Sequence, residues 1–200
     1  LVTNTAWDFK EDAKGMIYPE SLDEIPAEFA EIAAETREEL LEAASDFSED
    51  LMMAVLEGEE IDVDELKRAI RAGVLAGKMN PVFVGSAYKN KGIQELLDAV
   101  IDYLPSPLDV PEIDGTNLKG EEEVRHADVK EPFSALAFKI MTDPYVGKLT
   151  YIRIYSGQAE AGSYVYNSVK DGRERLGRIL EMNANDRVDR EECSAGDIVA

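Results

Sequence analysis

The segment from Pro81 to Ile93 constrains the fold more than any other part of the sequence, because its residue pattern changes twice within a short distance. The apolar run Val82-Phe83-Val84 stops at the small residues Gly85-Ser86-Ala87, and an amphipathic helical pattern follows. A continuous Val/Phe run between Pro and Gly is typical of a strand covered on both faces, as in a parallel sheet. The sequence therefore predicts a buried strand, a tight loop and a helix.

The predicted helix runs from residue 93 to 104 and ends at Pro105. Its apolar residues recur at helical spacing, and they are Ile93, Leu96, Leu97, Val100, Ile101 and Leu104. In open α/β sheets, ligands bind at the carboxyl ends of the strands, so the Gly85-Ser86-Ala87 loop lies where a small-molecule contact is expected. The alternative is an ordinary tight turn between a strand and a helix.

The chain carries a formal net charge of −21, and the acidic residues gather in its first part. Residues 1–80 hold 21 acidic against 7 basic residues, whereas residues 132–200 hold 10 against 9. Ser21, Glu24 and Pro26 predict the start of a long helix over residues 26–46. Its apolar face is marked by Phe29, Ile32, Ala33, Thr36, Leu40, Ala44 and Phe47.

The other side of this long helix is acidic, with Glu28, Glu31, Glu35, Glu38, Glu39 and Glu42. Like charges three or four residues apart destabilise a helix slightly, so helix propensity alone does not explain the stripe. Two interpretations remain open. The stripe is either a solvated helix face or a docking surface for a basic partner.

Two shorter helices are predicted after it, over residues 51–57 closed by Gly58 and over residues 64–71 closed by Gly73, with Asp62 as an N-terminal cap. Leu66 and Ile70 are expected in their core. Lys67, Arg68 and Arg71 form a basic cluster that neutralises nearby acids and a helix C-terminus.

From residue 105 to 131 the pattern gives way to Pro, Asp, Gly and charge, as in an interdomain linker. After Pro132 the apolar period becomes two, which predicts strands at 133–141, 149–155, 163–167 and 174–182 and the start of another at 196–200. Regular strands without intervening helices favour a barrel. Arg173 and Arg175 alternate along one strand and so share one face, where they either contact phosphate or are solvated charges.

The sequence lacks the residues that several classes of function require. No apolar run approaches the ~20 residues of a membrane span, and one cysteine and one histidine leave no disulfide and little for zinc or histidine chemistry. Gly73 to Lys78 is one residue short of a phosphate-loop spacing and is followed by Met79 instead of Ser or Thr. Asn90-Lys91-Gly92-Ile93 lacks the Asp of a guanine-reading motif. Cys193 and His126 are interpreted as structural.

The segment from Pro81 to Pro111 closely resembles the last strand and helix of the GTPase domain of bacterial translation elongation factor G. The segment from Ala137 to Thr150 resembles the opening of that family's second domain. The resemblance implies an α+β multidomain fragment. Residues 1–80 are then a helical insert, residues 81–104 the final strand and helix of a P-loop GTPase α/β domain, residues 105–131 a linker, and residues 132–200 an antiparallel β-barrel, domain II, truncated at its C-terminus.

The resemblance further implies a cytoplasmic, monomeric, GTP-dependent translocase that drives tRNA and mRNA movement on the ribosome. Catalytic and magnesium-binding residues would lie upstream, so this segment alone should be inactive and hold no GTP, GDP or Mg²⁺. Backbone groups of Ser86, Ala87 and Tyr88 would contact the guanine. Glu31, Glu35 and Glu42 would meet the ribosomal stalk protein, and Arg173 and Arg175 would meet small-subunit rRNA. A ribosomal protection or recycling paralogue, or a non-catalytic interaction module, is the alternative.

Overall fold

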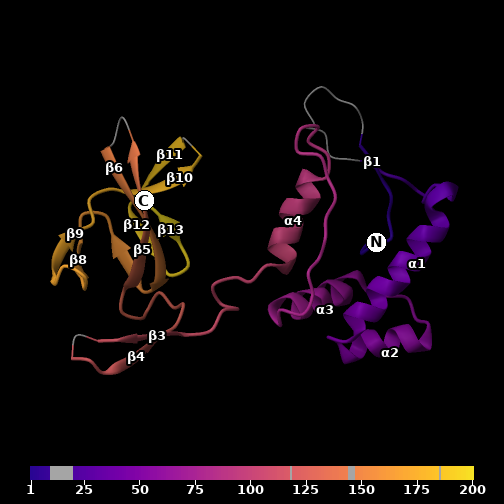
Figure 1. Cartoon of the computed structure of the whole chain (residues 1–200), viewed down its shortest axis with the longest axis horizontal. Helices are drawn as coiled ribbons and strands as arrows, with labels where there is room; N and C mark the ends of the chain where they lie inside the picture. Colours follow the sequence, from indigo (N-terminus) through magenta and orange to yellow (C-terminus); the bar gives the residue numbers. More distant parts are fainter. Residues whose placement is uncertain (10–19, 118, 144–146, 185) are drawn as a thin grey trace. The chain divides into compact units, whose positions relative to one another are not determined.

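The computed structural model describes residues 1–9, 20–117, 119–143, 147–184 and 186–200 (Figure 1). These residues form two compact units, Leu1–Pro105 and Ser106–Ala200, here named the helical unit and the β unit. Helices occupy the first unit, and antiparallel strand pairs make up the second. The predicted combination of helices and antiparallel strands is confirmed at this level.

The helical unit contains four described helices, α1 (Ala27–Ser45), α2 (Glu49–Glu57), α3 (Val63–Leu75) and α4 (Ile93–Tyr103). A short strand pair, β1 (Trp7–Asp8) with β2 (Glu20–Ser21), precedes them. Ser21 therefore lies in a strand and does not cap α1, whose N-cap is Pro26 without a side-chain hydrogen bond. The capping role predicted for Ser21 is wrong, because strand pairing with Trp7 holds it away from the helix.

Local capping residues define α2 and α3. The Ser48 hydroxyl accepts a hydrogen bond from the Leu51 N–H at 3.2 Å, and Gly58 closes α2 in the left-handed conformation with φ of 69°. The Asp62 carboxylate accepts from the Asp64 N–H at 3.1 Å, which confirms the predicted cap. Gly73 lies inside α3 and does not end it, so its predicted role as a helix stop is wrong.

The core of the helical unit lies between α1, α2, α3 and α4 and consists of Ala44, Leu51, Leu66, Ala69, Ile70, Ala99 and Tyr103. Leu66 and Ile70 are buried as predicted. The apolar face of α1 is covered only in its second half. Phe29 and Ile32, in the first half, are 54% and 58% exposed.

The predicted buried strand at residues 82–84 is not part of any sheet in the described chain. Val82 and Val84 are 87% and 93% exposed, and the only bridge nearby joins Ser86 to Lys91. The apolar face of α4 is also open to solvent, with Ile101 77% exposed. A strand needs hydrogen-bonding neighbours, and no other described strand lies beside this segment. The prediction of burial is therefore wrong for this structure, although the helix itself is present.

The β unit is built from antiparallel pairs. Its strands are β3 (Ile113–Thr116), β4 (Glu122–Arg125), β5 (Ser134–Asp143), β6 (Gly147–Ser156), β7 (Gln158–Glu160), β8 (Tyr164–Asn167), β9 (Gly172–Arg175), β10 (Ile179–Asn183), β11 (Asp186–Arg190), β12 (Glu192–Ser194) and β13 (Ile198–Val199). One sheet has the order β13-β6-β5, and the other pairs are β3-β4, β8-β9, β10-β11 and β7-β12.

A small core joins β6, β7, β10, β12 and β13, with Ile154, Ala159, Ile179, Cys193 and Val199 at its centre. Cys193 is 1% exposed and packs in this core, as predicted, and this burial raises the pKa of its thiol. The predicted strand over 174–182 is two strands, because the chain breaks at residues 176–178 where Leu176 packs on the core. The interval 105–131 contains the β3-β4 hairpin, which the sequence pattern did not predict.

Candidate functional site

The hairpin of β8 and β9 lies at the periphery of the β unit (Figure 1). The pairing of its two strands places two arginines and two tyrosines on one face. Its register pairs Tyr164 with Arg175 and Tyr166 with Arg173. Directly paired residues lie on the same side of a sheet, and residues two apart along a strand share a face. All four side chains are exposed, whereas Val165 and Glu174 on the opposite face are partly buried. These four residues are named the Arg–Tyr face.

The side chains of the Arg–Tyr face are held by specific contacts. The Arg173 guanidinium carbon lies 5.0 Å from the centre of the Tyr164 ring, a cation–π contact. The Arg175 Nε donates to the Gly162 carbonyl oxygen at 3.2 Å. The Tyr166 hydroxyl donates to Asp171 Oδ1, which raises the pKa of Tyr166 and keeps its ring neutral. The rings and guanidinium groups are therefore oriented before any partner arrives.

Glu174, the acidic residue of β9, points away from the Arg–Tyr face. Glu174 accepts hydrogen bonds from Lys170 Nζ at 2.5 Å and from Asn167 Nδ2 at 3.0 Å, and these contacts lower the pKa of Glu174. Lys170 is thus occupied in neutralising Glu174. Arg178, which follows β9, lies 4.0 Å from Asp189. Neither Lys170 nor Arg178, the basic residues near Arg173 and Arg175 in sequence, belongs to the Arg–Tyr face.

The tyrosines of this face were not among the residues that the sequence pattern singled out. The alternation of Tyr164 and Tyr166 was visible in the sequence. Their pairing with the arginines, however, depends on where the turn between β8 and β9 falls. That position sets the register, and the register sets which residues face each other.

The predicted guanine-contact residues Ser86, Ala87 and Tyr88 form a tight turn. Ser86 and Lys91 exchange two backbone hydrogen bonds of 2.9 and 3.1 Å, and the Lys89 N–H donates to the Ser86 carbonyl at 3.1 Å. A Cβ at Gly85 would lie 2.8 Å from the Lys91 carbonyl oxygen, so only glycine fits there. The turn is therefore fixed by close backbone approach.

Two backbone N–H donors of this turn have no acceptor among the residues that the structure describes. Within the described residues, the N–H groups of Ala87 and Tyr88 make no hydrogen bond, and the Tyr88 side chain is 99% exposed. Backbone N–H groups without a partner can donate to a ligand carbonyl. The arrangement suits the predicted backbone contact, and the contact itself stays a prediction.

The glutamates predicted to bind a partner lie on the solvent side of α1. Glu31, Glu35 and Glu42 are exposed, and none of them forms an ion pair within the described part of the chain. Arg37, on the same helix, donates instead to the Val2 carbonyl at 3.1 Å. Among the described residues, these three glutamates therefore form a negative surface without paired cations, and its partner stays a prediction.

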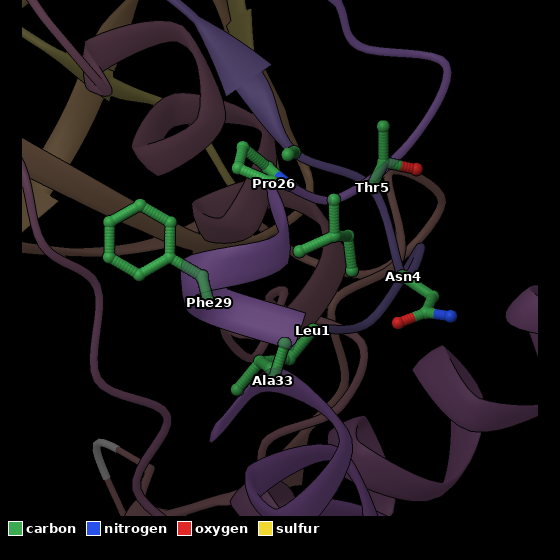
Figure 2. Close-up of a pocket in the computed structure, with 8 residues that line it drawn as sticks. Leu1, Asn4, Thr5, Pro26, Phe29 and Ala33 are labelled. Carbon is green, nitrogen blue, oxygen red and sulfur yellow. The ribbon is translucent and has the colours of Figure 1, made fainter. Parts of the chain in front are cut away.

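A pocket of about 240 Å³ lies between the beginning of the chain and the start of α1 (Figure 2). It is lined by Leu1, Asn4, Thr5, Ala6, Ile25, Pro26, Phe29 and Ala33. The lining side chains are mostly apolar, and none is an acidic, basic or thiol side chain.

In the described ranges, no three His, Cys, Asp or Glu residues converge as metal ligands. No helix in these ranges has the length and apolarity of a membrane span.

Residues 132–200 match the family Elongation factor G domain 2, and this part of the chain belongs to that family. The resemblance to elongation factor G indicated by the sequence is therefore confirmed for the β unit.

The likeness to known structures extends beyond the β unit. A crystal structure of a protein from Thermus thermophilus matches 99% of this chain with a TM-score of 0.71 and 26% sequence identity. The present chain spans about a quarter of the length of that protein, since it covers 26% of it.

Proposed function

We propose that the chain is part of a ribosomal translocase of the elongation factor G kind, a cytoplasmic GTPase that drives tRNA and mRNA movement on the ribosome. The observation that carries the proposal is the match of residues 132–200 to elongation factor G domain 2. The Arg–Tyr face supplies this domain with a cationic surface suited to ribosomal RNA. The protein acts as a monomer and meets tRNA and mRNA only through the ribosome.

In this proposal, residues 81–104 are the last strand and helix of the GTPase domain, and residues 1–80 form its helical insert. The exposure of Val82, Val84 and Ile101 supports this assignment, because such apolar surface is normally covered by the neighbouring strands of a sheet. GTP and Mg²⁺, when bound, supply the hydrolysable phosphate and its charge neutralisation. Their phosphate-side ligands belong to residues beyond this sequence.

The role of this chain toward the nucleotide is recognition of the base. The free N–H groups of Ala87 and Tyr88 donate to the guanine carbonyl oxygen, and Ser86 holds the turn through its two backbone bonds with Lys91. Gly85 permits the close approach of the two backbone segments. A larger residue at position 85 would therefore weaken guanine nucleotide binding without touching the nucleotide.

Two surfaces meet the ribosome in this proposal. Glu31, Glu35 and Glu42 of α1 bind the ribosomal stalk protein, because an uncompensated acidic stripe attracts a basic partner. Arg173 and Arg175 contact the phosphates of small-subunit rRNA.

The test is co-sedimentation of the chain with isolated small ribosomal subunits. The variant Arg173→Gln/Arg175→Gln removes both cations of the Arg–Tyr face and should weaken binding about tenfold or more at 0.1 M salt, because each lost phosphate contact also loses counterion release. The matched control Lys119→Gln/Arg178→Gln removes the same charge elsewhere in the β unit and should bind as the parent chain does. Equal loss in both variants, or no binding by the parent, would contradict the proposal.

A further inference from the structure

We infer that the Arg–Tyr face binds unpaired RNA bases by stacking, so that its RNA target is a single-stranded stretch and not the backbone of a duplex. This inference rests on the proposed ribosomal function and names the kind of RNA that one of its surfaces takes. The partner is recognised by two exposed aromatic rings combined with two guanidinium groups on the same face.

The rings of both tyrosines are exposed on this face and lie outside the core of the β unit. The Tyr164 and Tyr166 side chains are 60% and 44% exposed, and neither belongs to the core of the β unit. They are two residues apart on β8, so their Cα atoms are about 7 Å apart and their rings present two separate surfaces. Exposed aromatic rings on a sheet face are how many proteins stack unpaired bases.

The arginines complete a stacking platform. The Arg173 guanidinium carbon already lies 5.0 Å from the centre of the Tyr164 ring, so a cation and an aromatic ring are in contact before RNA binds. Arg175, opposite Tyr164 on β9, is tethered by the Gly162 carbonyl oxygen. Groups that are oriented in advance lose less conformational entropy on binding. A guanidinium group is planar, so it can both stack on a base and bind a phosphate. An ammonium group cannot do both.

The local charges favour RNA in spite of the acidic chain. Glu174 faces the opposite side and is neutralised by Lys170, and Asp171 accepts the hydroxyl hydrogen bond of Tyr166. Residues 1–80 hold 21 of the 42 acidic residues, whereas residues 132–200 hold 10 acidic against 9 basic residues.

Phosphate contact alone would not require this arrangement. Two arginines on a flat polar strand would serve a duplex backbone equally well, whereas rings add affinity only for bases that are free to stack. An acidic protein segment would likewise need the cations and not the rings. The presence of both groups on one face selects single-stranded RNA.

The experiment compares three labelled nucleic-acid probes, each about ten nucleotides or base pairs long. Each probe is titrated with the whole 200-residue chain. They are single-stranded oligo(A), an abasic strand with the same number of phosphates, and an RNA duplex. We expect oligo(A) to bind about tenfold more tightly than the abasic strand, since one stacked base contributes roughly this factor.

Substitutions then separate stacking from charge. Tyr164→Leu/Tyr166→Leu should remove the preference for oligo(A) over the abasic strand, whereas Tyr164→Phe/Tyr166→Phe should keep it. Arg173→Gln/Arg175→Gln should weaken both strands and make the salt dependence shallower. Urea unfolding of every variant checks that the β unit remains folded.

Three outcomes would overturn the inference, and they differ in what they say about the ribosomal function. Equal binding of oligo(A) and the abasic strand, with small-subunit binding intact, would mean phosphate contact only and would leave the proposed function standing. Binding to small subunits with no binding to any probe would indicate a protein partner. Failure to bind either small subunits or probes would remove the proposed function as well.

Discussion

Gly73 in α3 lies directly against the ring of Phe47, which follows α1, and this contact sets how closely the two helices approach. A Cβ added at Gly73 would lie 2.9 Å from Cε2 of Phe47. Glycine normally weakens a helix interior. Its presence inside α3 is explained by this close approach, because no other residue leaves room for the ring.

Gly73→Ala should destabilise the helical unit by about 1–3 kcal/mol, although alanine is the better helix former. Urea denaturation monitored by helical circular dichroism measures the change. In a Phe47→Leu background the same substitution should cost clearly less, because the ring is gone and the two changes are coupled. Strict additivity of the two substitutions would show that the ring and the glycine do not constrain each other.

Arg71 of α3 should act as a C-terminal cap for α4. Its Nη1 donates to the carbonyl oxygens of Asp102 and Leu104, each at 3.0 Å. Arg71→Met should therefore lower the free energy of unfolding by about 1–2 kcal/mol, through lost hydrogen bonds and lost interaction with the helix dipole. The control Arg68→Met removes an exposed guanidinium whose partner is Glu65 on the same helix, and it should cost at most about 0.5 kcal/mol. Similar losses in both variants would count against the capping role.

His126 should make the region around β3 and β4 sensitive to pH. Its ring contacts Glu131 at 2.6 Å and Glu112 at 2.7 Å, and these hydrogen bonds raise the pKa of His126. Because the pKa of His126 is higher in the folded protein, the contacts of its charged ring contribute to stability. This contribution to stability is complete below the ordinary His pKa of about 6.5 and is lost as pH rises through the folded pKa. The His126 backbone N–H lowers the pKa of Glu131, so that contribution is lost as pH falls below about 4.5.

The two contributions overlap between about pH 4.5 and 6.5, where the contacts of His126 should be most stable. His126 is the one histidine in the sequence, so its ring signals in an NMR titration report directly on this site. We expect a pKa above the ordinary value, and Glu131→Gln should move it downward. A normal His126 pKa in the parent chain would exclude the contacts in solution.

Replacing Glu31, Glu35 and Glu42 with Gln should leave the helical unit folded. Several glutamates of α1 lie three or four residues apart, so removing charge should leave stability unchanged or raise it by up to about 1 kcal/mol. The same variant should lose affinity for the ribosomal stalk protein in an isothermal titration. Replacement of Glu59 and Glu60, acidic residues outside the stripe, is the control. Undiminished stalk-protein affinity would reduce the stripe to a solvated helix face.

The parts of the fold that depend on local sequence could be predicted, and the parts that depend on distant contacts could not. The Asp62 cap of α3 could be predicted because it acts within two residues, whereas the Ser48 cap of α2, which begins at Glu49, was not predicted. The function of Gly73 was not predictable, because it depends on the position of Phe47 in the turn after α1. The break between β9 and β10 depends on Leu176 turning into the core.

The candidate sites divide in the same way. The turn at Ser86 and Ala87 could be predicted because the pattern changes after Val84 within a short segment, and its contact with a nucleotide stays a prediction. The shared face of Arg173 and Arg175 followed from strand alternation. Their pairing with Tyr166 and Tyr164 required the hairpin register, which no single strand reveals. Burial of residues 82–84 was predicted from their apolar character, but burial also needs neighbouring strands, and the described residues provide none.

The most direct test of the account asks whether the β8-β9 hairpin lies against ribosomal RNA. Cys193 is the only cysteine and is 1% exposed, so Val169→Cys, at a site that is 93% exposed in the hairpin turn, adds one accessible thiol for an iron chelate. Val188→Cys on β11 is the matched control. With small subunits bound, radicals from position 169 should cleave small-subunit rRNA at one region, and radicals from position 188 should cleave it weakly or elsewhere. Binding to small subunits without rRNA cleavage from position 169 would contradict the account.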